Sequence, residues 1–259
     1  MHQAPTHDVS SSIPAAAPAS VRGTLQHFIT AAHCDGSDST TLETNVSPPI
    51  AVGALVTARL YKLPCANALE NAIRNMCETG CDRAMDVYTH AYIHGPEDIA
   101  RISATSILSY PESERAHCPA LRVISGLAVF HLHEYQKNVK QKILLLFHDT
   151  GVDLITREMA AYIVYNGPLE CQGGYFDEYR GFYIRQWWLI ACQLAQHQIN
   201  TLVAPLSRSV FDQQFIMRIL ERTNCPHCRD ILMRNWRDIC SVVRARMYAL
   251  ADTVNLVIS

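Results

Sequence analysis

The chain has no strong excess of either charge and no apolar stretch long enough to cross a membrane. Its 22 lysines and arginines nearly balance 24 aspartates and glutamates, which leaves a formal net charge of −2. This balance excludes a global attraction to nucleic acid or to anionic lipid. The longest apolar runs, 143–147 and 187–192, are far shorter than a membrane span. The first 22 residues lack the apolar core of a signal peptide, so we expect an intracellular protein without membrane contact.

The apolar fraction of 49% is high enough to bury a core. Residues 1–20 are rich in Ala, Ser and Pro and are predicted to be a disordered tail, while 21–259 are predicted to form a single domain. Residues 66–92 carry apolar side chains at every third or fourth position, which predicts a helix. Gly95-Pro96 should end it and begin a second helix. Further helices are predicted over 153–165, 209–221 and 229–252.

Other stretches are predicted to be strands. Apolar and polar residues alternate around Val129, and the run 142–147 is β-prone, which predicts strands between 120 and 146. The aromatic and β-branched stretches at 173–176, 182–192 and 201–204 are predicted to be strands as well, although 185–197 fits a helix equally well. This mixture of elements favours an α+β fold over a regular parallel α/β order.

Three of the ten cysteines lie near the C-terminus with the spacing of zinc ligands. Cys225 and Cys228 flank a two-residue turn, and Cys240 follows in a predicted helix. Zn²⁺ prefers four soft or borderline ligands in a tetrahedron, and a two-residue gap lets both thiolates of a turn reach one ion. We therefore predict a structural zinc ion here. The candidates for its fourth ligand are His197, Cys192 and His227.

A second zinc set is predicted around a helical cysteine pair. Cys77 and Cys81 lie four residues apart, which places both on one face of the predicted helix. His117 and Cys118 would complete the set, with His94 as a substitute. With both sets, the predicted fold is a zinc-stabilised α+β domain.

Core packing is the alternative for all of these cysteines. A free cysteine packs like a small hydrophobe and is among the most buried residue types. We favour that interpretation for Cys34, Cys65 and Cys171. Disulfides rank last, because nothing in the sequence indicates a secreted protein.

Four segments, taken in their order and spacing, carry a resemblance to a known family. They are Cys77 and Cys81 with Ile93-His94-Gly95, His117-Cys118 with residues 120–126, Arg180-Gly181 with Trp187, and Cys225-Pro226-His227-Cys228 with Cys240. Over roughly residues 60–250 the chain resembles the adenoviral early-region-four thirty-four-kilodalton proteins, the products of the sixth open reading frame of that region.

The resemblance implies an adaptor without catalytic activity. Members of this family act in the host nucleus, with the host cytoplasm as an alternative location. They bring the host elongin B/C and cullin ubiquitin ligase to proteins that are then degraded, often together with a second viral early protein, and they influence late viral mRNA export. Elongin C is bound by a helix with a leucine, a small residue four positions on and an aliphatic residue four further on. Leu121, Ser125 and Val129 fit that spacing, and Leu121 would insert into an apolar pocket.

Rival functions fit the sequence less well. His148-Asp149 resembles the metal-binding step of phosphohydrolases, but the run before it predicts a strand where that chemistry needs a helix. A zinc deaminase needs a His-x-Glu before its cysteine pair, and none is present in a suitable place. Nucleic-acid binding is the runner-up, because arginines surround Trp236 in the predicted C-terminal helix. The negative net charge and the missing His-x-x-x-His half of a zinc finger make nucleic acid an unlikely partner.

Overall fold

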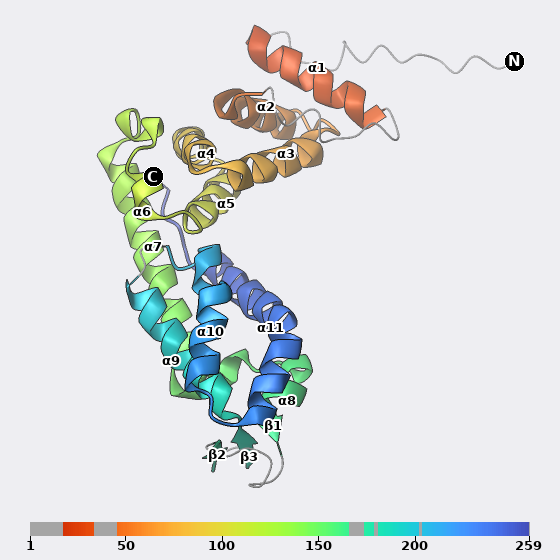
Figure 1. Cartoon of the computed structure of the whole chain (residues 1–259). Coiled ribbons are helices and arrows are strands. Elements are labelled where there is room, and N and C mark those ends of the chain that lie inside the picture. Colours follow the sequence, from red (N-terminus) through yellow and green to blue (C-terminus); the bar gives the residue numbers. More distant parts are fainter. Residues whose placement is uncertain (1–17, 34–45, 166–173, 179–180, 202–203, 259) are drawn as a thin grey trace, which may run out of the picture. The chain divides into compact units, whose positions relative to one another are not determined.

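The structure is a computed structural model that describes residues 18–33, 46–165, 174–178, 181–201 and 204–258. The chain divides into two compact units (Figure 1). Unit 1 comprises Met1–Ile107, Ser113–Leu132 and Leu256–Ser259, and unit 2 comprises Leu108–Glu112 and His133–Asn255. Most of the predicted tail lies outside the described residues, and Ala19 already begins a helix. The single domain expected over 21–259 stays a prediction.

Helices form nearly all of the regular structure, so the predicted α+β class is wrong. The described residues contain one small sheet of three antiparallel strands, in the order β1-β3-β2. The central strand β3 (Phe182–Ile184) pairs with β1 (Val164–Tyr165) and with β2 (Tyr175–Asp177). Strands of two or three residues are too short to form a layer of the fold, so helix packing supplies both cores.

The strands expected between 120 and 146 are replaced by one long helix, α7 (Gly126–Leu146). The alternation around Val129 covers only a few residues. Over a longer window, buried side chains recur at every third or fourth position, which is the pattern of a helix. They are Ala128, Leu132, Tyr135, Val139 and Ile143.

Unit 1 is built from helices that precede α7. They are α1 (Ala19–His33), α2 (Pro48–Leu60), α3 (Ala66–Thr79), α4 (Cys81–His94) and α5 (Glu97–Ile107). Helix α4 packs against α2, α3 and α5, and its buried side Val87–Tyr88 lies in the core with Leu69 and Ile73. A short helix α6 (Glu112–Arg115) and the 3-10 helix η3 (Pro119–Arg122) lead into α7.

Glycines set the helix ends in this unit. The helix predicted over 66–92 is in fact two helices, because Gly80 adopts an extended conformation between α3 and α4. Helix α4 ends where expected, since Gly95 takes a left-handed φ of 89° and its N–H donates to the Ala91 carbonyl. Pro96 then precedes α5, so the predicted break and second helix are confirmed.

Unit 2 contains most of α7 and the helices that follow it. They are η4 (Asp149–Leu154), α8 (Arg157–Ile163), α9 (Gln186–Thr201), η5 (Arg208–Phe211), α10 (Gln213–Arg222) and α11 (Pro226–Asp252). Thr156 and Asp212 cap α8 and α10, because each side chain accepts a hydrogen bond from the N–H three residues on. The helices predicted over 209–221 and 229–252 are confirmed. Beyond Ile184 the predicted strand is wrong, and the helical alternative for 185–197 is correct.

No helix in the part of the chain that the structure describes has the length and apolarity needed to cross a membrane.

Candidate functional site

The segment predicted to bind elongin C does not form one continuous helix. Leu121 lies half-buried in η3, whereas Val129 lies in α7. Between them, the Ser125 hydroxyl accepts a hydrogen bond from the N–H of Ala128 at 3.1 Å. A serine hydroxyl bound to the N–H three residues on is a helix N-cap, so α7 begins after Ser125. Leu121 and Val129 therefore do not share a helical face in this structure.

Four large apolar side chains around this cap are exposed to solvent. The exposed fractions are 75% for Val123, 51% for Leu127, 39% for Val129 and 56% for Phe130. We call these four residues the α7 apolar patch. Leu127 and Phe130 lie three residues apart in α7 and are neighbours on its surface. Of these four, only Val129 is among the residues predicted from the sequence, although the spacing of positions 123, 127 and 130 is itself a helical signal.

Hydrogen bonds hold the start of α7 against α4. The buried Tyr88 hydroxyl donates to the Ala128 carbonyl at 2.9 Å, and burial raises the pKa of this phenol. One turn further on, the Tyr92 hydroxyl lies 2.9 Å from Nδ1 of His131. The buried side of this part of α7 is thus fixed in unit 1, and Leu127, Val129 and Phe130 of the α7 apolar patch lie at exposed positions of the same turns.

The first predicted zinc set does not fit one ion. Cys225 precedes α11, Cys228 lies in its first turn, and Cys240 lies twelve residues further along the same unbroken helix. An α-helix rises about 1.5 Å per residue, so Cys228 and Cys240 are about 18 Å apart. Thiolates bound to one zinc ion lie about 4 Å from each other. One zinc ion bound by all three cysteines would require the chain to turn back after Cys228, and the continuous helix α11 does not do so.

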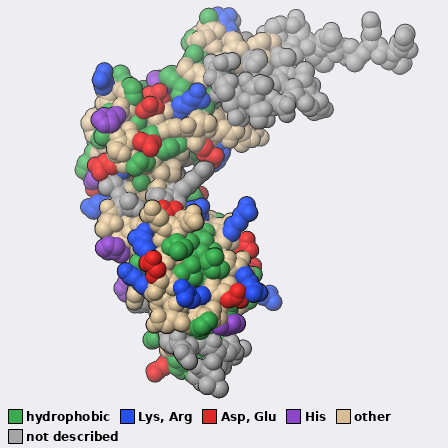
Figure 2. Space-filling view, viewed as in Figure 1, with side chains coloured by type: hydrophobic (Ala, Val, Ile, Leu, Met, Phe, Trp, Pro, Cys, Tyr) green, Lys and Arg blue, Asp and Glu red, His purple; other side chains and the backbone are tan. Residues whose placement is uncertain are grey.

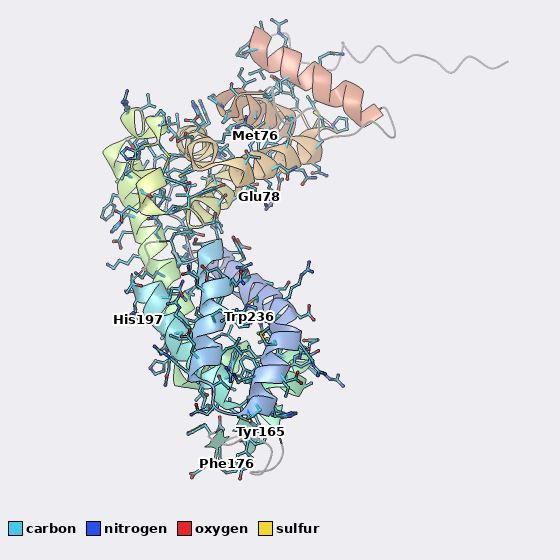
Figure 3. All side chains as sticks on the ribbon, in the orientation of Figure 1. Met76, Glu78, Tyr165, Phe176, His197 and Trp236 are labelled. Carbon is cyan, nitrogen blue, oxygen red and sulfur yellow. The ribbon has the colours of Figure 1, made fainter. Side chains whose placement is uncertain are left out.

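The candidates for the fourth ligand of this set are dispersed. His197 is exposed on the outer side of α9 (Figure 3), and His227 is exposed near the start of α11. Cys192 is buried and lines an apolar cavity of about 10 Å³ together with Cys240. Burial raises the pKa of Cys240 to about 12 and also raises that of Cys192, so both are neutral thiols at pH 7.

The second predicted zinc set is brought together only in part. The sulfur atoms of Cys81 and Cys118 lie 3.4 Å apart in the interior of unit 1. Cys77 is buried in α3, and burial raises its pKa to about 12. His117 is exposed, as is His94, whose ring stacks on that of His90. The described residues contain no group of three or more His, Cys, Asp or Glu side chains arranged to hold a metal ion.

His148 follows the end of a helix, whereas the sequence predicts a strand before it. The run 142–147 belongs to α7 and the turn after it, and His148 follows that helix instead of lying on it. Thr150 has a left-handed φ of 75°, and its carbonyl accepts hydrogen bonds from Nε1 of Trp188 at 2.9 Å and from Sγ of Cys192 at 3.6 Å. These contacts lock the turn onto α9.

The arginines of α11 do not accompany an open aromatic ring. The side chain of Trp236, a residue of α11, lies between α10 and α11 (Figure 3). Its ring stacks on that of Phe215, with 5.7 Å between the ring centroids. Arg234 pairs with Asp230, and the Arg244 guanidinium lies over the Phe211 ring. Figure 2 shows hydrophobic side chains gathered over α10 and α11, with both charge signs around them. This face lacks the continuous basic track that a nucleic-acid backbone requires.

The sequence matches no protein-family model, and neither the curated proteins nor the solved structures give a significant match.

Proposed function

We propose that the chain is a non-catalytic viral adaptor that docks through the α7 apolar patch onto host elongin C. It would thereby recruit the elongin B/C and cullin ubiquitin ligase to proteins that are degraded. One observation carries the proposal: four large apolar side chains are exposed within residues 123–130. This is the segment in which the resemblance implies an elongin-binding helix. Exposed apolar clusters on soluble proteins mark interaction surfaces.

The spacing of the patch suits a helix that enters a groove. Such helices use anchors at i, i+3 or i+4, and i+7, which is the spacing of Val123, Leu127 and Phe130. Burial of a leucine or phenylalanine side chain contributes about 1.5–3 kcal/mol, so Leu127 and Phe130 would be the strongest anchors. Val123 lies before the Ser125 cap, and an extension of α7 by about one turn on binding would bring it onto the helix. Leu121 would join the helix only with an extension of about one and a half turns.

The test is capture of purified elongin B/C by the full chain, with the affinity measured by calorimetry. Leu127→Ser with Phe130→Ser should weaken binding at least tenfold, because both anchors lose their apolar contact. The matched control is Leu145→Ser. Leu145 is 67% exposed on the same helix but lies outside the patch, so this variant should bind like the wild type.

Two results would contradict the proposal. One is wild-type protein that does not bind elongin B/C, and the other is binding that survives the double substitution. Both exchanged residues are exposed, so circular dichroism should show an unchanged helix content. Capture of nucleic acid that is lost steeply with salt would instead favour the runner-up function. A second viral partner and a role in late mRNA export stay predictions of the resemblance.

A further inference from the structure

Two cysteines of unit 1 are in sulfur–sulfur contact although they lie far apart in the sequence. Cys81 is the first residue of α4, and Cys118 immediately precedes η3. Their Sγ atoms are 3.4 Å apart, and the side chains are 6% and 3% exposed. A disulfide bond is about 2.05 Å long, so the sulfurs need to approach by little more than 1 Å.

The backbone holds both residues in place. Cys118 donates its N–H to the Arg115 carbonyl at 3.2 Å and accepts from the Leu121 N–H at 3.1 Å. Its sulfur also lies 3.5 Å from the Glu114 carbonyl. Cys81 is fixed at the start of α4, directly after the extended Gly80. The contact therefore joins two well-anchored backbone positions and does not depend on a mobile side chain.

We propose that Cys81 and Cys118 are a redox-active pair that forms an intrachain disulfide when the reduced chain meets a peroxide. The bond would tie the start of η3 covalently to the start of α4. Both cysteines belong to unit 1, and the proposal does not depend on elongin binding.

The reaction needs only hydrogen peroxide as oxidant. One thiol loses its proton, and the resulting thiolate attacks a peroxide oxygen. The O–O bond breaks, the released hydroxide takes up the proton as water, and a sulfenic acid forms. The second sulfur then attacks the sulfenic sulfur and displaces the hydroxyl group, which leaves as a second water with the remaining thiol proton. Two thiols and one peroxide thus give one disulfide and two waters. The two sulfurs lose two electrons in total, and the peroxide accepts them.

The bond would close a loop that contains α4, α5 and α6. A cross-link of this span restricts the unfolded chain, and we expect the melting temperature of unit 1 to rise by about 5–10 °C. The link would also fix the residue from which the chain enters η3 and the α7 apolar patch.

The experiment uses the full chain, reduced, freed of reductant and treated with hydrogen peroxide. The intact mass should fall by about 2 Da, and peptide mapping without reduction should join Cys81 to Cys118. Cys81→Ser and Cys118→Ser should each abolish this link. Cys77→Ser removes another buried thiol of the same unit and should leave the link intact. The wild-type peptide map decides the question even where a variant folds poorly.

Several outcomes would overturn the proposal. They are sulfinic acid at either residue without a cross-link, a link between other cysteines, or disulfide-joined dimers. The zinc content is measured on the same samples. Stoichiometric zinc that is lost in both Cys81→Ser and Cys118→Ser, together with no cross-link in the wild type, would assign the pair to a metal instead.

Discussion

The two units bury different kinds of side chain. All three tryptophans of the chain belong to unit 2, where Trp188 and Trp236 pack with Phe147, Phe211 and Phe215. The described core of unit 1 contains neither tryptophan nor phenylalanine. Its large buried side chains are aliphatic residues, sulfur-containing residues and tyrosines.

This difference determines how closely the helices can pack. Helices α2 and α4 of unit 1 bury several alanines, among them Ala54 and Ala84, which lets their backbones approach closely. In unit 2 the rings leave the apolar cavity of about 10 Å³ between them. We therefore expect unit 1 to tolerate enlargement poorly and unit 2 to depend on its large rings. Tryptophan fluorescence reports on unit 2 alone, whereas far-ultraviolet circular dichroism reports on both units.

The largest effect is expected from Trp187→Ala. The side chain is fully buried, and removal of such a ring costs about 3–5 kcal/mol of unfolding free energy. Trp187→Phe should cost less than half as much, because Nε1 of Trp187 has no hydrogen-bond partner among the described residues. Urea unfolding followed by both signals measures the change. Equal shifts in the two signals would show that the units unfold together as the single predicted domain, and a shift in fluorescence alone would show that they do not.

A smaller effect is expected from enlargement of a buried alanine. Ala84→Val in unit 1 should cost about 1–3 kcal/mol, because Ala84 is fully buried and added methyl groups strain a closely packed core. Ala191→Val in unit 2 is the matched control, since Ala191 borders the cavity and should accept the added methyl groups at less than half that cost. Thermal unfolding of both variants provides the comparison. Equal losses of unfolding free energy in Ala84→Val and Ala191→Val would contradict the proposed difference in packing between the two cores.

Gly151→Ala should destabilise unit 2 by about 1–2 kcal/mol, because left-handed backbone is strained for alanine. Gly151 has a φ of 60°, and a Cβ atom there would meet Sγ of Cys192 at 2.5 Å. Addition of Cys192→Ala should recover the part of the loss that comes from this collision. A double-mutant cycle by urea unfolding separates strain from collision. The idea fails if the two substitutions are simply additive.

The smallest effect is the pH dependence from Asp98 in unit 1. The hydrogen bond from Arg59 at 2.8 Å lowers the pKa of Asp98, so its ion pair stabilises the fold above about pH 4. This contribution should be lost as the pH falls through the lowered pKa. Asp98 is half exposed, which limits the effect to about 0.2–1 kcal/mol. Asp98→Asn should reduce the dependence of the unfolding free energy on pH below about pH 4, as measured by circular dichroism. Asp230→Asn in unit 2 is the control, because it removes another exposed ion pair, that with Arg234.

The sequence predicts the helix end at Gly95-Pro96 but does not predict the break at Gly80 between α3 and α4. Gly95 was identifiable because only glycine readily adopts its left-handed conformation, and Pro96 cannot continue the preceding helix. Helix α7 was mistaken for strands because short alternation near Val129 outweighed the longer stripe of buried positions. The sequence does not decide between helix and strand for α9, because its aromatic start, Trp187 and Trp188, is also typical of a strand.

The candidate sites were harder to predict, because they depend on contacts between elements. Cys81 and Cys118 were assigned to one set, but only packing within unit 1 shows that these two sulfurs touch and that His117 is exposed. The spacing of Leu121 and Val129 implied one helix, yet the Ser125 side chain starts a new helix between them. For Cys228 and Cys240 the sequence alone is sufficient. The helix predicted over 229–252 already places these two cysteines too far apart to bind one zinc ion.

The hydrogen bond between Trp188 and Thr150 can report how often the turn that follows α7 opens. The indole N–H of Trp188 donates to the Thr150 carbonyl, so it is withheld from water while the turn stays closed. Exchange of this proton for deuterium requires the turn to leave α9. The exchange rate of a single indole resonance would therefore report how often this corner of the protein opens.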